Sequence, residues 1–127
     1  MIQINKYEYL ITLWGETLKI SFSPHSILRC KQRQKNPKSI IQSIMSCQER
    51  IKDLRYSHQR FTMLDYAYNN ACILAFNNPH KLSVVTVLDG VDAWTEGALD
   101  LITKTKREVH RYVCADVRCV CAIILPR

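Results

Sequence analysis

Three side chains that can contact a phosphate recur at intervals of four residues: His25, Arg29 and Arg33. In a helix these positions fall within roughly 80° of arc, and successive members lie roughly 6 Å apart along the axis. An imidazole can donate or accept a proton near neutral pH, since its unperturbed pKa is about 6.5. A guanidinium can hold a phosphate through paired N–H donors. The spacing therefore predicts a ridge suited to a string of phosphates.

Basic charge is concentrated in the same part of the chain. The formal net charge is +7, and residues 25–60 hold nine Lys and Arg against two acidic residues. Residues 1–24 hold two of each sign, and residues 61–127 hold seven of each. An excess confined to one helical region indicates an acidic partner, although a solvated helical face is the alternative. The nine basic residues are Arg29, Lys31, Arg33, Lys35, Lys38, Arg50, Lys52, Arg55 and Arg60.

The whole chain has the composition of one globular domain. Its 127 residues are 47% hydrophobic and 23% charged, which predicts a single domain over 1–127 with its own core. No run approaches 18 apolar residues, so no membrane partner is expected. The start, M-I-Q-I-N-K-Y-E-Y, lacks the pattern of a secretory signal, which predicts a cytoplasmic protein. A mature fragment of a larger secreted toxin would look the same.

A hairpin is predicted at the start of the chain. Residues 7–14 are rich in β-forming side chains, Gly15-Glu16 can turn the chain, and residues 17–22 alternate between apolar and polar.

Two helices are predicted to follow the hairpin. Ser23-Pro24 and Asn36-Pro37 each combine a capping residue with proline at the first helical position. They predict helices over about 24–34 and about 37–54. The second carries an apolar stripe, for which core packing is the natural explanation.

The second half of the chain is predicted to be mostly β. Asn-rich turns separate three consecutive strands, and short connections of this kind favour an antiparallel meander. A helix after Thr95 and a nearly continuous apolar strand, central or packed on both faces, complete the chain. Helices grouped before a mostly antiparallel sheet define an α+β layered domain. The predicted strands are 60–68, 71–76, 81–88 and 117–125.

The first helix, the second helix and a later strand together resemble a known family. Ser23 to Gln34 reads S-P-H-S-I-L-R-C-K-Q-R-Q, an isoleucine-rich helix follows, and the strand reads K-L-S-V-V-T-V-L-D-G. These resemble the small toxin-like proteins related to RelE and BrnT, whose superfamily includes barnase-like, EndoU-like and colicin-type ribonucleases. The resemblance covers residues 21–90 and makes residues 91–127 an addition. Relatives often place a glycine after the second arginine, where this chain has Q-K-N-P, so the activity stays open.

The resemblance implies an RNA-binding, metal-independent endoribonuclease of toxin type, with an acidic antitoxin or immunity protein as a further partner. RNA carries its own nucleophile, the 2′-hydroxyl, so cleavage needs a base, an acid and cations for the charge on phosphorus. His25 can transfer the protons, Arg29 and Arg33 can hold the phosphate, and Thr86 becomes a catalytic candidate through the strand resemblance alone. No cofactor is expected. Additional predicted RNA contacts are Lys31, Lys35, Lys38, Arg55, His58, Arg60 and His80.

Two other functional classes remain open. A non-catalytic regulator from a phage or mobile element could engage nucleic acid or a host protein through the same basic helices. An immunity or antitoxin-type protein is the third class. Tyr66 and Tyr68 have the same orientation on the predicted strand 60–68, so they could stack on bases, with aromatic core packing as the alternative.

The six cysteines are interpreted as small buried hydrophobes, because several lie in apolar runs and no secretory signal is present. His110, Cys114, Cys119 and Cys121 could ligate zinc, but no C-x-x-C spacing is present. A metal site is therefore not predicted.

Overall fold

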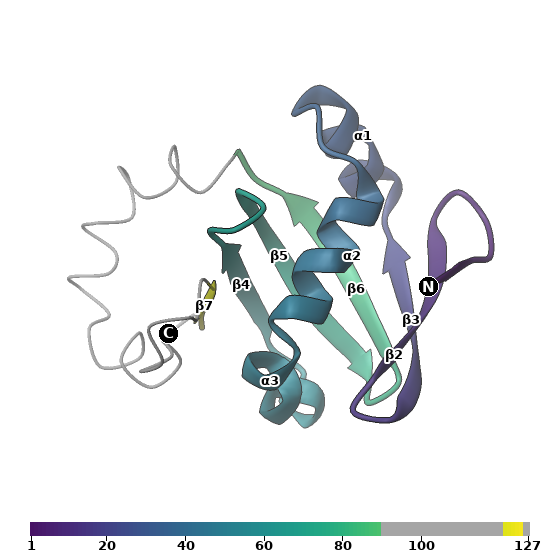
Figure 1. The fold of residues 1–127 in the computed structure, drawn as a ribbon, viewed down its shortest axis with the longest axis vertical. Helices are drawn as coiled ribbons and strands as arrows, with labels where there is room; N and C mark the ends of the chain where they lie inside the picture. The colour runs from purple at the N-terminus through teal and green to yellow at the C-terminus, as the bar shows by residue number, and fades with distance from the viewer. Residues whose placement is uncertain (90–120, 126–127) are drawn as a thin grey trace.

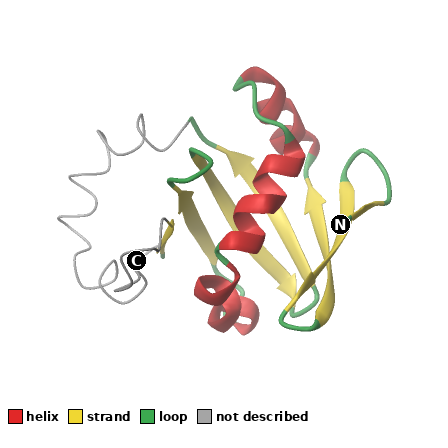
Figure 2. Ribbon diagram, in the orientation of Figure 1, coloured by secondary structure: helices red, strands yellow, loops and turns green. Residues whose placement is uncertain are grey.

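The computed structural model describes residues 1–89 and 121–125. They form an α+β layer in which a seven-stranded sheet packs against helices that lie across one of its faces (Figures 1 and 2). The strands are β1 (Ile2–Gln3), β2 (Glu8–Leu13), β3 (Glu16–Phe22), β4 (Arg60–Asp65), β5 (Asn70–Asn78), β6 (Lys81–Val87) and β7 (Cys121–Ile124). The helices are α1 (Pro24–Gln32), α2 (Pro37–Ser46), α3 (Gln48–Ile51) and the 3₁₀ helix η1 (Lys52–Tyr56).

The predicted hairpin and the predicted meander belong to one continuous sheet. The strand order is β1-β2-β3-β6-β5-β4-β7, and every pair is antiparallel except β3–β6, which is parallel. The parallel junction places Ile20 opposite Leu82. A parallel pair needs a crossover connection, and here that connection is the helical segment between β3 and β4 together with the meander itself. The antiparallel hairpin and meander are confirmed, while β1 was not predicted.

The turn between β2 and β3 is shifted by one residue from its predicted position. Trp14 and Gly15 both have positive φ, 54° and 73°, which is the pattern of a two-residue type I′ hairpin turn. The shift places the Trp14 side chain against the helices, where its indole N–H donates to the carbonyl of Gln48 at 3.0 Å. The hairpin is thereby fastened to the start of α3.

Both helix starts agree with the cap-plus-proline prediction. The Ser23 hydroxyl accepts the Ser26 N–H at 3.0 Å, and the Asn36 side chain accepts the Lys38 N–H at 2.9 Å. Side-chain caps of this kind satisfy N–H groups that a helix cannot satisfy itself. α1 ends at Gln32, two residues before the predicted end.

The prediction of one helix over 37–54 was wrong in its second half. The backbone leaves the helix at Cys47, with φ −96° and ψ 11°, and continues as α3 and η1. The Gln48 side chain donates to the Met45 carbonyl at 3.0 Å, and the Gln48 carbonyl accepts the hydrogen bond from the Trp14 indole N–H. Tertiary contacts thus satisfy the backbone at a break that the apolar periodicity does not reveal.

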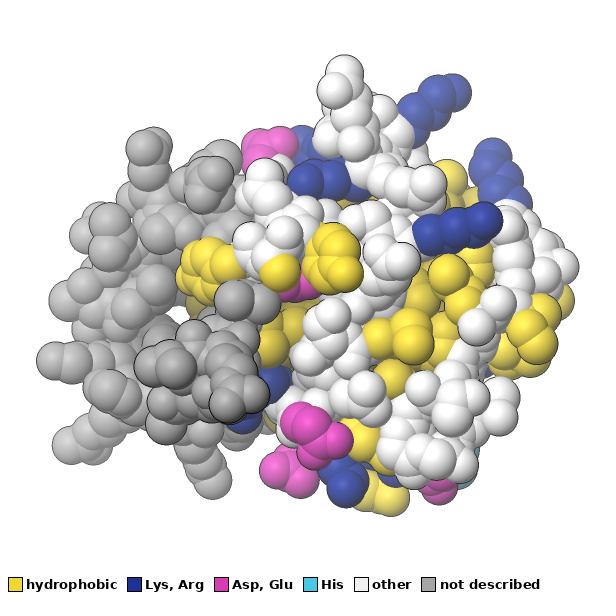
Figure 3. Space-filling model, in the orientation of Figure 1, with side chains coloured by type: hydrophobic (Ala, Val, Ile, Leu, Met, Phe, Trp, Pro, Cys, Tyr) yellow, Lys and Arg dark blue, Asp and Glu magenta, His cyan; other side chains and the backbone are white. Residues whose placement is uncertain are grey.

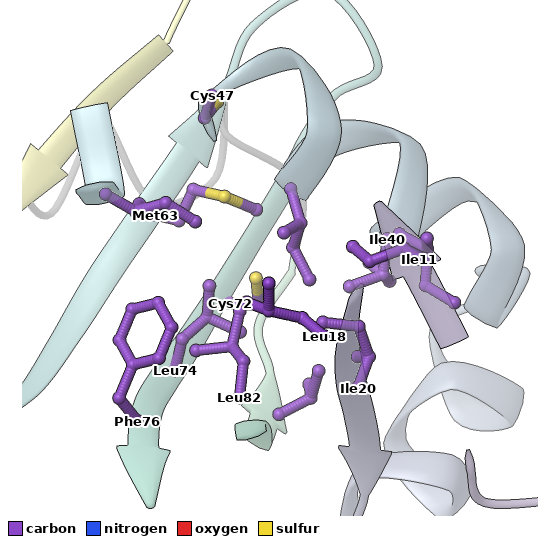
Figure 4. Packing of buried hydrophobic residues seen from close by; sticks show 14 of the residues in the cluster. Ile11, Leu18, Ile20, Ile40, Cys47, Met63, Cys72, Leu74, Phe76 and Leu82 are labelled. Carbon is purple, nitrogen blue, oxygen red and sulfur yellow. The ribbon is translucent and has the colours of Figure 1, made fainter. Parts of the chain in front are cut away.

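One hydrophobic core lies between the helices and the sheet. Ile40, Ile41 and Ile44 of α2 are fully buried, as predicted for the apolar stripe. They pack over side chains from all the central strands, including Leu18, Ile20, Leu74 and Leu82 (Figure 4). Phe61 and Phe76 stack with ring centroids 6.2 Å apart.

Predictions for the C-terminal quarter are tested only in part. The helix expected after Thr95 and residues 117–120 of the strand predicted over 117–125 lie outside the described residues. β7 is the last strand of the described sheet and pairs with β4, so it is not central. Its two faces are nevertheless both covered, because Ile123 joins the main core and Ile124 packs with Leu64 and Ala71. None of the described helices is long and apolar enough to cross a membrane.

Candidate nucleic-acid interface

α1 brings His25 and Arg29 together on its exposed side. The Arg29 Nε–H donates to His25 Nε2 at 3.4 Å, a long and therefore weak hydrogen bond, and Arg29 also donates to the Gln32 side chain at 3.0 Å. The opposite side of α1 faces the interior, where Ser26 and Cys30 are buried. The predicted pairing of an imidazole with a guanidinium one turn away is present.

Arg33 does not continue the row as a free cation. It follows the last residue of α1 and turns toward the end of β6, where Nε–H donates to the Val87 carbonyl at 2.9 Å. Its other arm forms an ion pair with Asp89 at 2.8 Å. The Asp89 carboxylate offsets the Arg33 charge, so Arg33 serves mainly to fasten α1 to β6.

Thr86, the catalytic candidate taken from the family resemblance, lies in β6 beside a β-bulge. It pairs with Ile73 and is partly buried, and its neighbour Val87 faces the core. Because side chains alternate along a strand, Thr86 lies on the other face of the sheet from Val87. In the described structure no hydrogen bond joins Thr86 to His25 or Arg29.

The segment that contains α1 and the α1–α2 connection carries several cations and no carboxylate of its own, and Asp89 from beyond β6 pairs with Arg33 there. No acidic residue occurs between positions 16 and 49. Lys31 and Lys38 are exposed, and Lys35 reaches the turn between β4 and β5, where its ammonium donates to the Asn69 carbonyl at 2.6 Å. Lys and Arg side chains project around this end of the space-filling view (Figure 3). We call His25, Arg29, Lys31, Lys35 and Lys38 the α1–α2 basic face.

The other predicted RNA contacts lie elsewhere. Arg55 in η1 and Arg60, at the start of β4, follow α3, at the opposite end of α2 from the α1–α2 connection (Figure 1). His58, between them, is exposed and has a φ of 56°. His80 is at the β5–β6 turn, 3.7 Å from Glu16. The sequence run of basic residues is therefore divided into two groups that α2 separates.

Arg55 is a buried structural residue. Its side chain is 8% exposed, and its guanidinium donates twice to the Pro79 carbonyl, at 3.1 and 3.0 Å. It also forms an ion pair with Glu16 at 2.6 Å and lies 4.7 Å from the centre of the Trp14 ring. The hydrogen bond from Arg55 lowers the pKa of the Glu16 carboxyl below its ordinary value. We call Trp14, Glu16, Arg55 and Pro79 the Arg55 cluster.

The two tyrosines considered for base stacking are on a turn rather than on a strand. β4 ends at Asp65, and Tyr66 and Tyr68 lie in the connection to β5 with 47% and 48% of their surfaces exposed. The alternative of aromatic core packing is therefore wrong for both. The contact between Lys35 and this turn was not predicted from the sequence. The pair Asn69-Asn70 did indicate a turn, but the turn in the structure begins earlier, directly after Asp65.

The described cysteines do not form a reactive or metal-binding site. Cys30, Cys47, Cys72 and Cys121 are buried and form no disulfide among the described residues, as predicted for small hydrophobes. Burial raises the pKa of Cys30 and of Cys72, and a hydrogen bond with Cys121 together with burial raises the pKa of Cys47. Residues 1–89 and 121–125 contain no group of three His, Cys, Asp or Glu side chains that could hold a metal ion. His110, Cys114 and Cys119 lie outside the described residues.

Comparisons with protein-family models, with curated proteins and with solved structures find no match for this chain. The resemblance to RelE- and BrnT-related proteins therefore stays a prediction.

Proposed function

We propose that the protein binds RNA through the α1–α2 basic face. The observation that carries this proposal is the exposed contact between His25 and Arg29 beside further lysines, in a stretch that holds no acidic residue. Phosphate groups are the ligands that such an arrangement of ammonium, guanidinium and imidazole groups favours. The α1–α2 basic face keeps its cations near solvent, whereas the Arg55 cluster uses its cation internally.

In the catalytic form of the proposal, the protein is a metal-independent endoribonuclease. His25 takes the proton from the 2′-hydroxyl as that oxygen attacks the adjacent phosphorus, and Arg29 stabilises the negative charge on the phosphoryl oxygens. The bond from phosphorus to the 5′-oxygen breaks, which leaves a 2′,3′-cyclic phosphate, and the 5′-oxygen takes a proton from water. His25 Nε2 accepts only a long bond from Arg29, so substrate can replace that contact. The two groups are then within reach of one phosphodiester.

A non-catalytic RNA-binding regulator is the second candidate. The charge of Arg33 is offset by Asp89, and no hydrogen bond joins Thr86 to the His25–Arg29 pair in the described structure. Two of the four residues expected to act in catalysis are thus not assembled with the others. Binding without cleavage needs only the exposed cations.

A cleavage assay in EDTA distinguishes the two forms. Total RNA is incubated with wild-type protein, with His25→Ala and with His58→Ala, a matched exposed histidine at the other end of α2. The nuclease form predicts fragments with wild type and His58→Ala and intact RNA with His25→Ala. Intact RNA in every lane, with salt-sensitive binding retained, would establish the regulator. Absence of both cleavage and binding would refute RNA as the ligand.

A further inference from the structure

The connection between β4 and β5, residues 66–69, presents two aromatic rings to solvent at the end of the sheet. Tyr66 and Tyr68 are 47% and 48% exposed, although most large apolar side chains of the described residues are buried. Aromatic rings can stack on nucleobases of any sequence, because every base has a flat π-face. We call residues 66–69 the tyrosine turn.

Two local features define the backbone of the tyrosine turn. The Asp65 carboxylate accepts the Ala67 N–H at 3.0 Å, and Asn69 adopts a left-handed backbone with φ of 52°. Asn can adopt this conformation at modest cost. The rings therefore project from a turn with a defined backbone, which reduces the entropy lost when a base stacks on them.

Hydrogen bonds to α2 hold the residue that follows the tyrosine turn. The Asn70 amide is fully buried and donates to the Ser39 carbonyl, the Ser39 hydroxyl and the Ser43 hydroxyl at 3.3, 3.0 and 2.9 Å. These bonds attach the first residue of β5 to the first two turns of α2. The backbone at the end of the tyrosine turn thus has a fixed position relative to α2, which carries Lys38 of the α1–α2 basic face.

A cation links the tyrosine turn to the α1–α2 basic face. The Lys35 ammonium donates to the Asn69 carbonyl at 2.6 Å, next in sequence to Tyr68. Lys35 lies between α1 and α2, which carry the exposed Lys31 and Lys38, so proposed phosphate-binding groups lie near the proposed stacking surface. The turn and the start of α2 are at the same end of the sheet (Figure 1).

We propose that the tyrosine turn is a stacking platform for unpaired bases, so that the α1–α2 basic face takes single-stranded RNA in preference to a duplex. The inference rests on the proposed RNA binding and specifies its substrate class. In a duplex the base faces are covered by neighbouring base pairs, and only the backbone reaches the lysines. A single strand offers phosphates to the cations and bases to Tyr66 and Tyr68.

The test measures affinity by fluorescence anisotropy with labelled 2′-O-methyl RNA, which lacks the nucleophile and cannot be cleaved. A single strand of about 12 nucleotides, within the usual site size of such proteins, is compared with a blunt duplex of the same sequence. The variants are Tyr66→Ala, Tyr68→Ala and the ring-retaining Tyr66→Phe and Tyr68→Phe. Tyr56→Ala is the matched control, because Tyr56 is an exposed tyrosine in η1 at the other end of α2.

Each alanine variant at the tyrosine turn is expected to lose about 5- to 150-fold in affinity for the single strand. Its affinity for the duplex should change less than about twofold, and the phenylalanine variants and Tyr56→Ala should resemble wild type. Single-strand affinity that is unchanged in Tyr66→Ala and Tyr68→Ala would overturn the platform, as would an equal loss for both RNAs. If wild type binds neither RNA, the proposed function itself fails.

Discussion

The two ends of α2 use the same residue types for different purposes. At the α1–α2 end, Arg29 is half-buried on α1, and its side chain donates hydrogen bonds to His25 and Gln32. At the α3–η1 end, Arg55 is buried, with its donors committed to Pro79 and Glu16. Figure 3 shows Lys and Arg side chains that extend outward at the α1 end, although the Asp89 carboxylate pairs with Arg33 there. Accessibility, rather than charge, distinguishes Arg29, the proposed phosphate contact, from the structural Arg55.

The Arg55 cluster holds together three segments that are distant in sequence. Trp14 comes from the first hairpin, Arg55 from η1, and Pro79 from the β5–β6 turn. A guanidinium can serve all three at once, since it offers five N–H donors and a flat face for an aromatic ring. A lysine could not reproduce this geometry.

The largest expected effect in this comparison is on stability at the buried end. Arg55→Ala should lower the free energy of unfolding by about 2–3 kcal/mol, because it removes the bonds to Pro79, the ion pair and the ring contact together. Lys52→Ala, an exposed change in the same 3₁₀ helix, should stay within about 0.5 kcal/mol. Urea denaturation followed by circular dichroism measures both. Similar losses in the two variants would contradict the structural role of Arg55.

The converse prediction concerns RNA affinity at the exposed end. Arg29→Ala combined with Lys31→Ala should lower RNA affinity at least tenfold, about 1.4 kcal/mol, and reduce the slope of log K against log salt by about 1.4. Lys52→Ala combined with Arg60→Ala removes the same charge at the other end and should change affinity much less. Salt titrations of the two double variants measure this difference. Equal effects would show that net charge alone governs binding.

The helix caps test whether the exposed end is preformed. Ser23→Ala should destabilise the protein by about 1 kcal/mol through loss of the α1 cap, and somewhat more because the hydroxyl also donates to the Val85 carbonyl at 3.3 Å. Asn36→Ala loses only the α2 cap and should cost slightly less. Thermal unfolding of both variants gives the order. A larger cost for Asn36→Ala would mean that the Val85 contact contributes nothing.

The smallest expected effect is a pH dependence at the buried end. Arg55 lowers the pKa of Glu16 below its ordinary value of 4.5, so the ion pair contributes fully above that value and is lost as pH falls through the lowered pKa. Glu16→Gln removes this contribution. Its urea midpoint should therefore fall less steeply than that of wild type between about pH 5 and about pH 2. Parallel curves for the two proteins would show that the pair adds no acid-sensitive stability.

Local patterns predicted most of the individual elements. Capping residues followed by proline set the starts of α1 and α2, because these signals act within one helical turn. Alternation and Asn-rich turns predicted the hairpin and the meander, because these patterns also involve residues close together in the chain. The break at Cys47 was missed, since it depends on the indole of Trp14, more than thirty positions away in the chain.

The candidate site was predicted in part. The four-residue spacing alone placed His25 beside Arg29, because helical geometry fixes neighbours one turn apart. The same spacing failed for Arg33, whose partners Val87 and Asp89 come from β6 and the residues after it. It also could not divide the basic run, because α2 carries Arg55 to the far end of the sheet.

The amino-acid sequence by itself determined the helix starts, the apolar stripe of α2, the strand alternation and the local excess of positive charge. Each of these follows from interactions between residues close together in the chain. Only the tertiary structure decided that β3 pairs in parallel with β6, that Arg55 is buried while Arg29 is only partly buried, and that Lys35 meets the turn of Tyr66 and Tyr68. Those outcomes depend on contacts between distant segments, and the burial that accompanies those contacts determines which charges remain available to a ligand.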